Sequence, residues 1–339
     1  MKAYVLHGVN DLRYDEIAIP ECPSGWSIVK VKVAGICSSD IARVFTKGTY
    51  HFPTIPGHEF SGIVESVGSE EDSHLIGKHV GIFPLIPCRQ CPQCADKHYE
   101  MCANYDYIGS RRDGGFAEYV AVPVWNLVLL NDSISFASAA MLEPLAVALH
   151  AMNLSGVKRG DSVAIVGTGM IGIAAAQWAK KLGASSVTII GRNESKRSIV
   201  EKCNLEYKVS TDKETVGQYD VVLEAVGTPQ AVDLSIHAAT PGGTVVFMGN
   251  PSADIEFAQN TYWRILRKQL KIVGTWNSSY DGTNPSDWTE TVEALAKNEV
   301  NVEPLISHYF NQEELMDGLI LMKYNKEPYC KVMTLWNDK

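Results

Sequence analysis

Short runs in which apolar and polar residues alternate dominate the segment before residue 150. In the run SIVKVKVAGI, Val29, Val31 and Val33 fall on the same side of an extended chain. The runs SGIVESVG and KHVGIFPLIP follow the same pattern, and proline and glycine interrupt the segment often. This combination predicts a β-rich domain built from short strands.

The pattern changes near residue 153. The stretch DSVAIVGTGMIGIAAAQWAKKLGASSVTIIG predicts a strand, a glycine turn, a helix and a second strand, and YDVVLEAVG, GGTVVFMGN and LKIVGTW are further short apolar runs. Nearly continuous apolar strands that alternate with helices are typical of a parallel sheet with helices on both faces. After about residue 285, DWTETVEALAKNEV predicts a helix and EPYCKVMTLW a final strand. The expected fold class is therefore α/β, with a β-rich domain at 1–152 and 286–339 and a doubly wound parallel sheet at 153–285.

Composition narrows the function classes. Of the 339 residues, 45% are hydrophobic and 20% are charged, which is typical of a globular protein. The net charge of −9 argues against a nucleic-acid-binding surface. No apolar run approaches the roughly 20 residues that a membrane-spanning helix needs. The first residues, MKAYVLHGVNDLRYDE, do not resemble a signal peptide, so we expect a cytoplasmic protein without membrane partners.

The stretch VAIVGTGMIG places three glycines in the spacing of a dinucleotide-binding turn, between a predicted strand and a predicted helix. Gly167 permits the tight turn, Gly169 lets the backbone approach a pyrophosphate, and Gly172 allows close packing of the helix on the strand. Met170 and Ile171 begin that helix, whose N-terminus favours phosphate. Further cofactor contacts are predicted where later strands end, at Val226, Gly227, Met248, Gly249, Gly274 and Thr275.

The end of the second strand bears on the choice of dinucleotide. NAD sites usually carry an acidic residue there, but this chain has Gly191 followed by Arg192, with Arg197 a little further on. A small residue and arginine leave room and positive charge for a 2′-phosphate, which favours NADP(H) over NAD(H). The alternative is that Arg192 is merely solvated and that Glu194 or a backbone group binds the ribose.

Four of the eight cysteines lie close together in CRQCPQCADKHYEMC. Four thiolates in one short segment suit a closed tetrahedral Zn²⁺ site with a structural role. An iron–sulfur cluster is the alternative, and disulfides fit the expected compartment less well. The predicted ligands are Cys88, Cys91, Cys94 and Cys102.

A second candidate metal site is dispersed along the chain. Cys37 lies in GICSSD, His58 and Glu59 lie in GHEF, and Glu143 lies in MLEPLAVALH. Cysteine, histidine and carboxylate are suitable Zn²⁺ ligands, and three protein ligands plus water make an open catalytic site. Taken one at a time, these residues are equally compatible with a core cysteine, a turn histidine and acids at helix starts.

Together, GICSSD, GHEFSGIVESVG, the four-cysteine segment, LEPLAVALH and GTGMIG resemble the zinc-dependent medium-chain dehydrogenase/reductase family, in this order and over essentially the whole chain. The resemblance implies a GroES-like β domain, a Rossmann domain, two zinc ions per chain, and a homodimer or homotetramer. It implies catalytic zinc bound by Cys37, His58 and Glu143, with Glu59 as a fourth or alternating ligand. Ser39 would begin a proton relay, but Ala42 replaces the histidine that some relatives carry next in that relay.

The segment YDYIGSRRDGGFAEY, supported by ARVFTKGTYHFPTIPGHE and RILRKQLKIVGTWNSSY, looks most like the sugar-alcohol-phosphate branch of the family. Because arginine matches phosphate geometry, Arg111 and Arg112 are candidate phosphate ligands, with Arg43 and Lys47 as further candidates. Tyr50, Trp276 and Asn277 are candidates for lining the polyol pocket.

Several alternatives stay open for this branch assignment. Arg111 or Arg112 could instead pair with Asp113 or Glu118, and the substrate could be an unphosphorylated polyol such as sorbitol or xylitol. The branch also implies NAD, which conflicts with Gly191 and Arg192. A non-catalytic zinc- and dinucleotide-binding protein is the remaining alternative.

Overall fold

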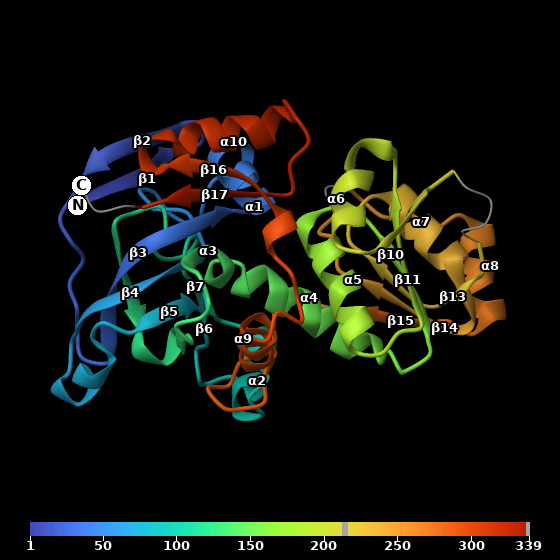
Figure 1. The fold of residues 1–339 in the computed structure, drawn as a ribbon, viewed down its shortest axis with the longest axis horizontal. Helices are drawn as coiled ribbons and strands as arrows, with labels where there is room; N and C mark the ends of the chain where they lie inside the picture. Colours follow the sequence, from blue (N-terminus) through green and yellow to red (C-terminus); the bar gives the residue numbers. More distant parts are fainter. Residues whose placement is uncertain (212–215, 252, 337–339) are drawn as a thin grey trace. The chain divides into compact units, whose positions relative to one another are not determined.

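The computed structural model describes residues 1–211, 216–251 and 253–336, and the chain forms two compact units (Figure 1). The β-rich unit comprises residues 1–143, 279–297 and 306–336, and the parallel-sheet unit comprises residues 144–278 and 298–305. The domain limits expected from the sequence, 1–152 with 286–339 and 153–285, remain a proposal about how the chain is organised.

The β-rich unit is built around the long strand β3 (Trp26–Ile36), which pairs antiparallel with β4 (Glu59–Val67) and β17 (Lys331–Leu335). Val29, Val31 and Val33 are buried while Lys30 and Lys32 are partly exposed, so the predicted alternation in this strand is confirmed. The remaining strands are β1 (Lys2–Gly8), β2 (Asp11–Glu16), β5 (His79–Ile82), β6 (Leu85–Ile86), β7 (Asp106–Tyr107), β8 (Tyr119–Pro123), β9 (Leu127–Leu129) and β16 (Ile306–Asn311). Its helices include α1 (Ser38–Ala42), α2 (Pro92–Ala95), α3 (Phe136–Ala139), α9 (Asp287–Ala296) and α10 (Leu315–Tyr324).

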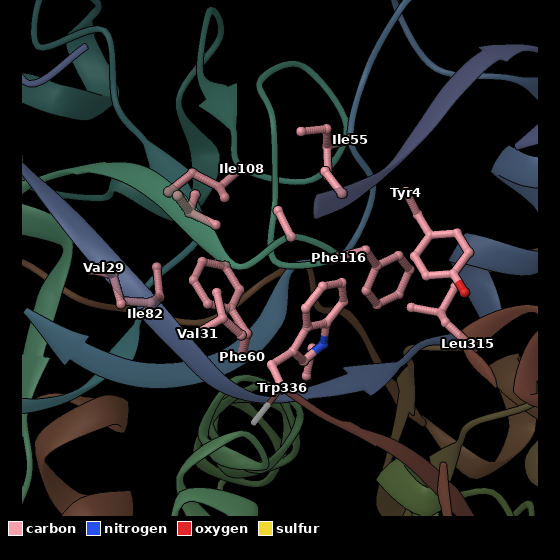
Figure 2. Close-up of a cluster of buried hydrophobic side chains, with 14 of the residues drawn as sticks. Tyr4, Val29, Val31, Ile55, Phe60, Ile82, Ile108, Phe116, Leu315 and Trp336 are labelled. Atoms are coloured by element: carbon pink, nitrogen blue, oxygen red, sulfur yellow. The ribbon is translucent and has the colours of Figure 1, made fainter. Parts of the chain in front are cut away.

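The core of the β-rich unit joins segments from both ends of the chain. Figure 2 shows Val29, Val31 and Phe60 of the central strands together with Tyr4 and Trp336. The indole of Trp336 is 2% exposed, and its ring packs edge-on against that of Tyr4. Burial of these side chains therefore fixes β17, which begins at Lys331, against β3.

In the parallel-sheet unit, the described residues form six parallel strands in the order β12-β11-β10-β13-β14-β15. Their bounds are β10 (Ser162–Val166), β11 (Ser186–Gly191), β12 (Glu206–Val209), β13 (Tyr219–Glu224), β14 (Ala239–Phe247) and β15 (Lys271–Gly274). The helices are α4 (Leu142–Ser155, which begins in the β-rich unit), α5 (Met170–Lys181), α6 (Arg197–Lys202), α7 (Pro229–Ala238) and α8 (Gln259–Lys268). The strand order reverses at β10, and ligands of open α/β sheets bind at the carboxyl ends of the strands near such a point.

Within the described part of the chain, we found no helix that is both long enough and apolar enough to span a membrane.

Candidate metal and cofactor sites

The four clustered cysteines converge around α2. One ligand atom from each of Cys88, Cys91, Cys94 and Cys102 lies within 4.8 Å of all the others, and the Cys88–Cys94 sulfur distance is 3.9 Å. Four thiolates about 2.3 Å from one zinc ion would stand about 3.8 Å apart, so the arrangement fits zinc. Backbone N–H groups of Ala103 and Cys94 lower the pKa of the Cys91 thiol to about 6, which favours the thiolate. None of the eight cysteines, all of which are described, forms a disulfide.

A second cluster lies where β3 and β4 run side by side. The register pairs Gly35 with Glu59, which brings Cys37, just after β3, close to His58, just before β4. Ligand atoms of Cys37, His58 and Glu59 lie within 4.8 Å of one another. A Cβ on Gly35 would stand 2.7 Å from Glu59 Oε2, so the glycine makes room for this carboxylate. The donor set of sulfur, imidazole and carboxylate fits a zinc ion.

Glu143, at the start of α4, is not part of this three-residue group but lies beside it. The Tyr107 hydroxyl donates a hydrogen bond of 3.1 Å to Glu143 Oε1, and the Tyr107 ring lies 5.8 Å from that of His58. Burial raises the pKa of Glu143; His58 opposes this shift and Glu59 reinforces it. The structure thus brings the two glutamates to the same centre, with Glu59 as the closer companion of Cys37 and His58.

A buried cation, Lys331, and a partly exposed one, Arg43, accompany the carboxylates of this centre. Lys331 Nζ donates a hydrogen bond to Glu59 Oε2 and another, of 3.3 Å, to Ile36 O. Burial lowers the pKa of Lys331, but Glu59 raises it, and the resulting pKa lies above the usual value. Arg43 Nη1 donates to Asp40 Oδ1 at 3.0 Å, and the backbone N–H of Cys37 donates to Asp40 Oδ2 at 2.9 Å.

Ser39 and His58 are tied to the same network. Arg43 Nη1 donates to Ser39 Oγ at 2.7 Å, so the hydroxyl expected to begin a proton relay faces an arginine. Burial lowers the pKa of His58, yet Asp40 and Cys37 raise it, and the resulting pKa lies well above the usual value. Arg43 thus donates its hydrogen bonds to Asp40 and Ser39, and this is not the arrangement expected of a ligand for substrate phosphate.

The glycine turn has the geometry that a pyrophosphate requires. Gly167 has a φ of 132°, which residues with side chains rarely adopt, and a Cβ on Gly172 would stand 2.4 Å from Gly167 O. The space beside Gly169, which caps α5, is open to a distance of 4 Å. Because α5 begins at Met170, its first N–H groups, including that of Ile171, face the end of β10 where phosphate would bind.

Four of the predicted contacts at the later strand ends, Val226, Gly227, Met248 and Gly249, bond to Glu224. Glu224, the last residue of β13, is 1% exposed, and its Oε1 accepts hydrogen bonds of 2.8 Å from the N–H groups of Val226 and Gly227. Met248 and Gly249 donate their N–H groups to the backbone oxygen of Glu224. Gly274 and Thr275 follow at the end of β15, where the Thr275 hydroxyl is buried and has no hydrogen-bond partner among the described residues. An orphaned hydroxyl at this edge of the sheet suits a ligand-binding position.

The two arginines that were expected to bind the 2′-phosphate differ in their surroundings. Arg197 forms a two-pronged ion pair with Glu194, and its guanidinium lies 4.7 Å from the centre of the Tyr207 ring. The side chain of Arg192 is exposed. Glu194, the alternative partner of the ribose, is therefore engaged by Arg197.

The candidate substrate residues fall into three groups. The Arg111 guanidinium lies 4.3 Å from the ring centre of Tyr50 and 4.4 Å from that of Tyr105. Arg112 instead pairs with Asp106 and lies 5.2 Å from a ring of Trp26; Asp113 and Glu118 accept backbone N–H groups of Ile55 and Lys2. Trp276 and Asn277 belong to the parallel-sheet unit, where Trp276 is 57% exposed and Asn277 Nδ2 is buried without a hydrogen-bond partner in the described chain.

Comparisons with known proteins agree with this architecture. The family model for the alcohol dehydrogenase GroES-like domain matches residues 23–132, and that for zinc-binding dehydrogenases matches residues 171–297. Galactitol 1-phosphate 5-dehydrogenase of Escherichia coli K12 is 34% identical over 91% of this chain and 92% of its own length. The chain belongs to the zinc-dependent medium-chain dehydrogenase/reductase family. Within this family it falls in the polyol dehydrogenase branch.

Solved structures and a second relative extend the comparison of this medium-chain dehydrogenase. A crystal structure of galactitol-1-phosphate dehydrogenase from E. coli superposes with a TM-score of 0.90 at 33% identity, over 99% of this chain and 100% of that one. A Sinorhizobium meliloti 1021 protein described as a zinc-binding dehydrogenase, bound to NADP, gives a TM-score of 0.88 at 30% identity, over 98% of both chains. Sorbitol dehydrogenase of Bacillus subtilis is 26% identical over 99% of this chain and 98% of its own length. The expected fold class, a GroES-like β domain with a Rossmann-type parallel sheet, is confirmed.

Three residues of this medium-chain dehydrogenase were not assigned a role from sequence. They are Lys331 and Tyr107 at the candidate metal centre and Glu224 at the carboxyl end of β13. Arg43, a candidate phosphate ligand from sequence, instead contacts Ser39 beside the candidate metal centre. Lys331 and Glu224 each carried a weak signal, because each is a charged residue at the end of a largely apolar strand. No signal in the sequence pointed to Tyr107, because a tyrosine between turn-forming residues does not indicate that it will bond to Glu143.

Proposed function

We propose that the protein is a zinc-dependent dehydrogenase that transfers a hydride between a nicotinamide dinucleotide and a secondary alcohol carbon of a sugar alcohol phosphate. The proposed activity is of the galactitol 1-phosphate 5-dehydrogenase type, with NADP(H) favoured over NAD(H). Cys37, His58 and Glu59 are the proposed ligands of the catalytic zinc, with Glu143 beside them. Cys88, Cys91, Cys94 and Cys102 are the proposed ligands of a structural zinc.

The observation that carries the phosphate proposal is the position of Arg111. Its guanidinium lies against the rings of Tyr50 and Tyr105, Nη1 donates to Tyr105 O at 2.7 Å, and Nε is buried without a hydrogen-bond partner in the described chain. The Tyr105 ring is 6.0 Å from that of Tyr107, which itself reaches Glu143. A cation held by aromatic rings this close to the metal centre, with donor capacity left over, suits a phosphate monoester.

The residues of the metal centre account for the chemistry as follows. Bound zinc would polarise the substrate oxygen, and the bound nicotinamide would exchange the hydride. Cys37, His58 and Glu59 would hold the metal, while Lys331 balances the charge of Glu59. The Ser39 hydroxyl accepts a hydrogen bond from Arg43, so its own proton is free to point to the substrate oxygen.

Arg111 and Arg112 provide a matched pair of variants to test the substrate proposal. We expect Arg111→Ala to raise the KM for galactitol 1-phosphate by roughly 10- to 100-fold, since hydrogen bonds to charged groups contribute about 1.5–3 kcal/mol. Arg112→Ala should leave this KM nearly unchanged, because Arg112 pairs with Asp106. Steady-state kinetics with galactitol 1-phosphate, galactitol, sorbitol and xylitol, each with NAD and NADP, provide the measurement. Equal turnover of free and phosphorylated polyols by all three proteins would point to the unphosphorylated-polyol alternative.

The same preparation separates an enzyme from a non-catalytic binding protein. We expect two zinc ions per chain, one at each cysteine-containing cluster, as measured by elemental analysis. Zinc confined to the four-cysteine site, with no polyol oxidation, would favour the non-catalytic alternative.

We also propose that the protein forms a homodimer or homotetramer through the β15 edge of the parallel sheet. β15 is an end strand, and the side chains on it and on the neighbouring α8 segment include several exposed apolar residues. These are Tyr262, Trp263 and Leu266 on α8 and Ile272 on β15, and the exposed Trp276 follows two residues after β15. Exposed apolar side chains beside an open strand edge favour self-association. Sedimentation of a double variant, Leu266→Glu with Ile272→Glu, should show a monomer, whereas an unchanged assembly would place the interface elsewhere.

A further inference from the structure

Gly191 occupies a position where the backbone does not require glycine. It ends β11, and its φ lies outside the left-handed region. A Cβ at this position would nevertheless stand 1.8 Å from Tyr207 Oη and 2.6 Å from Tyr207 Cζ. The next contact, with Thr168 Cγ2 at 2.8 Å, involves a methyl group that a rotation of the side chain can move. Tyr207, rather than backbone strain, is therefore what excludes a side chain from residue 191.

Tyr207 is firmly held in this position. It lies on β12 directly beside Ile189 of β11, is 5% exposed, and donates its hydroxyl hydrogen to Asn193 O. Arg197 covers the ring face and donates to Tyr207 O at 3.2 Å. A side chain at residue 191 would have to displace a buried ring, a hydrogen bond and a cation–π contact together.

The same contacts determine which charged side chain at the end of β11 remains available to a ligand. Arg197 is pinned between the Tyr207 ring and the carboxylate of Glu194, so the charges of that pair largely compensate. The exposed Arg192 directly follows Gly191. An acidic side chain at residue 191 is what would select NAD by binding the ribose hydroxyls, and its space is filled by the phenol.

We propose that Tyr207 is the specificity-determining residue of the dinucleotide site: by filling the space beside Gly191 it prevents a carboxylate from binding the adenosine ribose, and it leaves the 2′ position to Arg192. This inference rests on the proposed dinucleotide-dependent function but not on the identity of the polyol. It implies that Gly191→Asp, introduced alone, does not convert the protein to NAD preference.

Equilibrium binding of NADPH and NADH, followed by nicotinamide fluorescence in the absence of polyol, tests the proposal on the intact protein. The proteins are wild type, Gly191→Asp, Tyr207→Ala and the double variant. We expect Gly191→Asp alone to weaken binding of both dinucleotides by about tenfold, within the range for contacting residues. The double variant should gain about tenfold in preference for NADH relative to Tyr207→Ala, since the carboxylate then has room.

Either of two results would overturn the proposal. One is a Gly191→Asp protein that already prefers NADH and unfolds at the wild-type temperature. The other is a double variant with the same NADH-to-NADPH ratio as Tyr207→Ala. Failure to oxidise any polyol phosphate would refute the substrate proposal and leave this binding result intact, whereas a wild-type protein that binds neither dinucleotide would refute both.

A second pair of variants covers the case in which Tyr207→Ala does not fold. Tyr207→Phe removes the hydroxyl, which makes the 1.8 Å contact, but keeps the ring. Gly191→Ala should therefore lower the unfolding temperature and NADPH affinity less when it is combined with Tyr207→Phe than when it is introduced into wild type. Equal losses in both backgrounds would contradict the steric argument. Gly8→Ala is the matched control, because nothing lies within 4 Å of a Cβ at that position.

Discussion

Lys331 and Glu59 form a buried ion pair beside the candidate catalytic metal centre, with side chains only 5% and 2% exposed. They are separated by 272 positions in the chain and meet because β17 and β4 both pair with β3. Removing two charges from water is costly, and the cost is offset only when each partner stays in place. The pair therefore holds the Glu59 carboxylate in a defined position next to Cys37 and His58.

Lys331→Met should destabilise the protein by about 3–5 kcal/mol, because it leaves the Glu59 carboxylate buried without its partner. Urea unfolding of metal-free protein, in which no metal ion neutralises Glu59, provides the measurement, and visible absorption of the cobalt-substituted form reports on metal geometry. Lys331→Arg, which keeps the charge, is the control. Wild-type stability together with an unchanged cobalt spectrum in Lys331→Met would show that the lysine does not hold Glu59.

Arg43→Ala should lower kcat with little change in KM, because Arg43 orients the Ser39 hydroxyl through a 2.7 Å hydrogen bond. The effects of Arg43→Ala and Ser39→Ala should not add, since residues in one hydrogen-bond network are coupled by about 0.5–3 kcal/mol. Kinetics of the two single variants and the double variant test this expectation. Arg13→Ala, which removes a more exposed arginine paired with Asp11, serves as the control. Fully additive losses in kcat would mean that Arg43 acts independently of Ser39.

Glu224→Ala should weaken dinucleotide binding by about tenfold, because the N–H groups of Val226 and Gly227 lose their shared acceptor and the turn loosens. Asp220→Ala is a matched control at the opposite end of β13, where Asp220 accepts hydrogen bonds from Ser162. We expect this control to lower stability without changing dinucleotide affinity, as measured by calorimetric titration. The same loss of affinity in both variants would indicate a general effect on the sheet.

Cys94→Ser should remove about one zinc ion per chain and lower the unfolding temperature, because a structural site with three thiolates binds zinc less tightly. Elemental analysis and thermal unfolding provide the two measurements. Cys203→Ser, at a cysteine outside both clusters, is the control. Full zinc content in Cys94→Ser would exclude the four-cysteine site as assigned.

Local patterns in the sequence predict many of the strands, turns and donor sets of this structure. The alternation in SIVKVKVAGI predicts strand β3 because side chains alternate across a sheet, and GTGMIG predicts the turn before α5 because its neighbours are an apolar strand and a helix. The cysteine spacing likewise predicts convergence, since four thiols within 15 residues, Cys88–Cys102, cannot lie far apart. Motif order then supplied the family, which the comparisons confirm.

Partners distant in the chain could not be inferred in this way. Nothing in YDYIGSRRDGG indicates that Arg112 pairs with Asp106 while Arg111 lies between Tyr50 and Tyr105, since the two arginines are identical and adjacent in the chain. From sequence, Gly191 indicates only that the site leaves room for a 2′-phosphate. The structure shows that Tyr207 fills the space that a side chain at residue 191 would need. Residue types and spacing specify strands, turns and donor sets through short-range geometry. Which side chains meet depends on strand register and core packing, and these arise only when the whole chain buries its apolar surface.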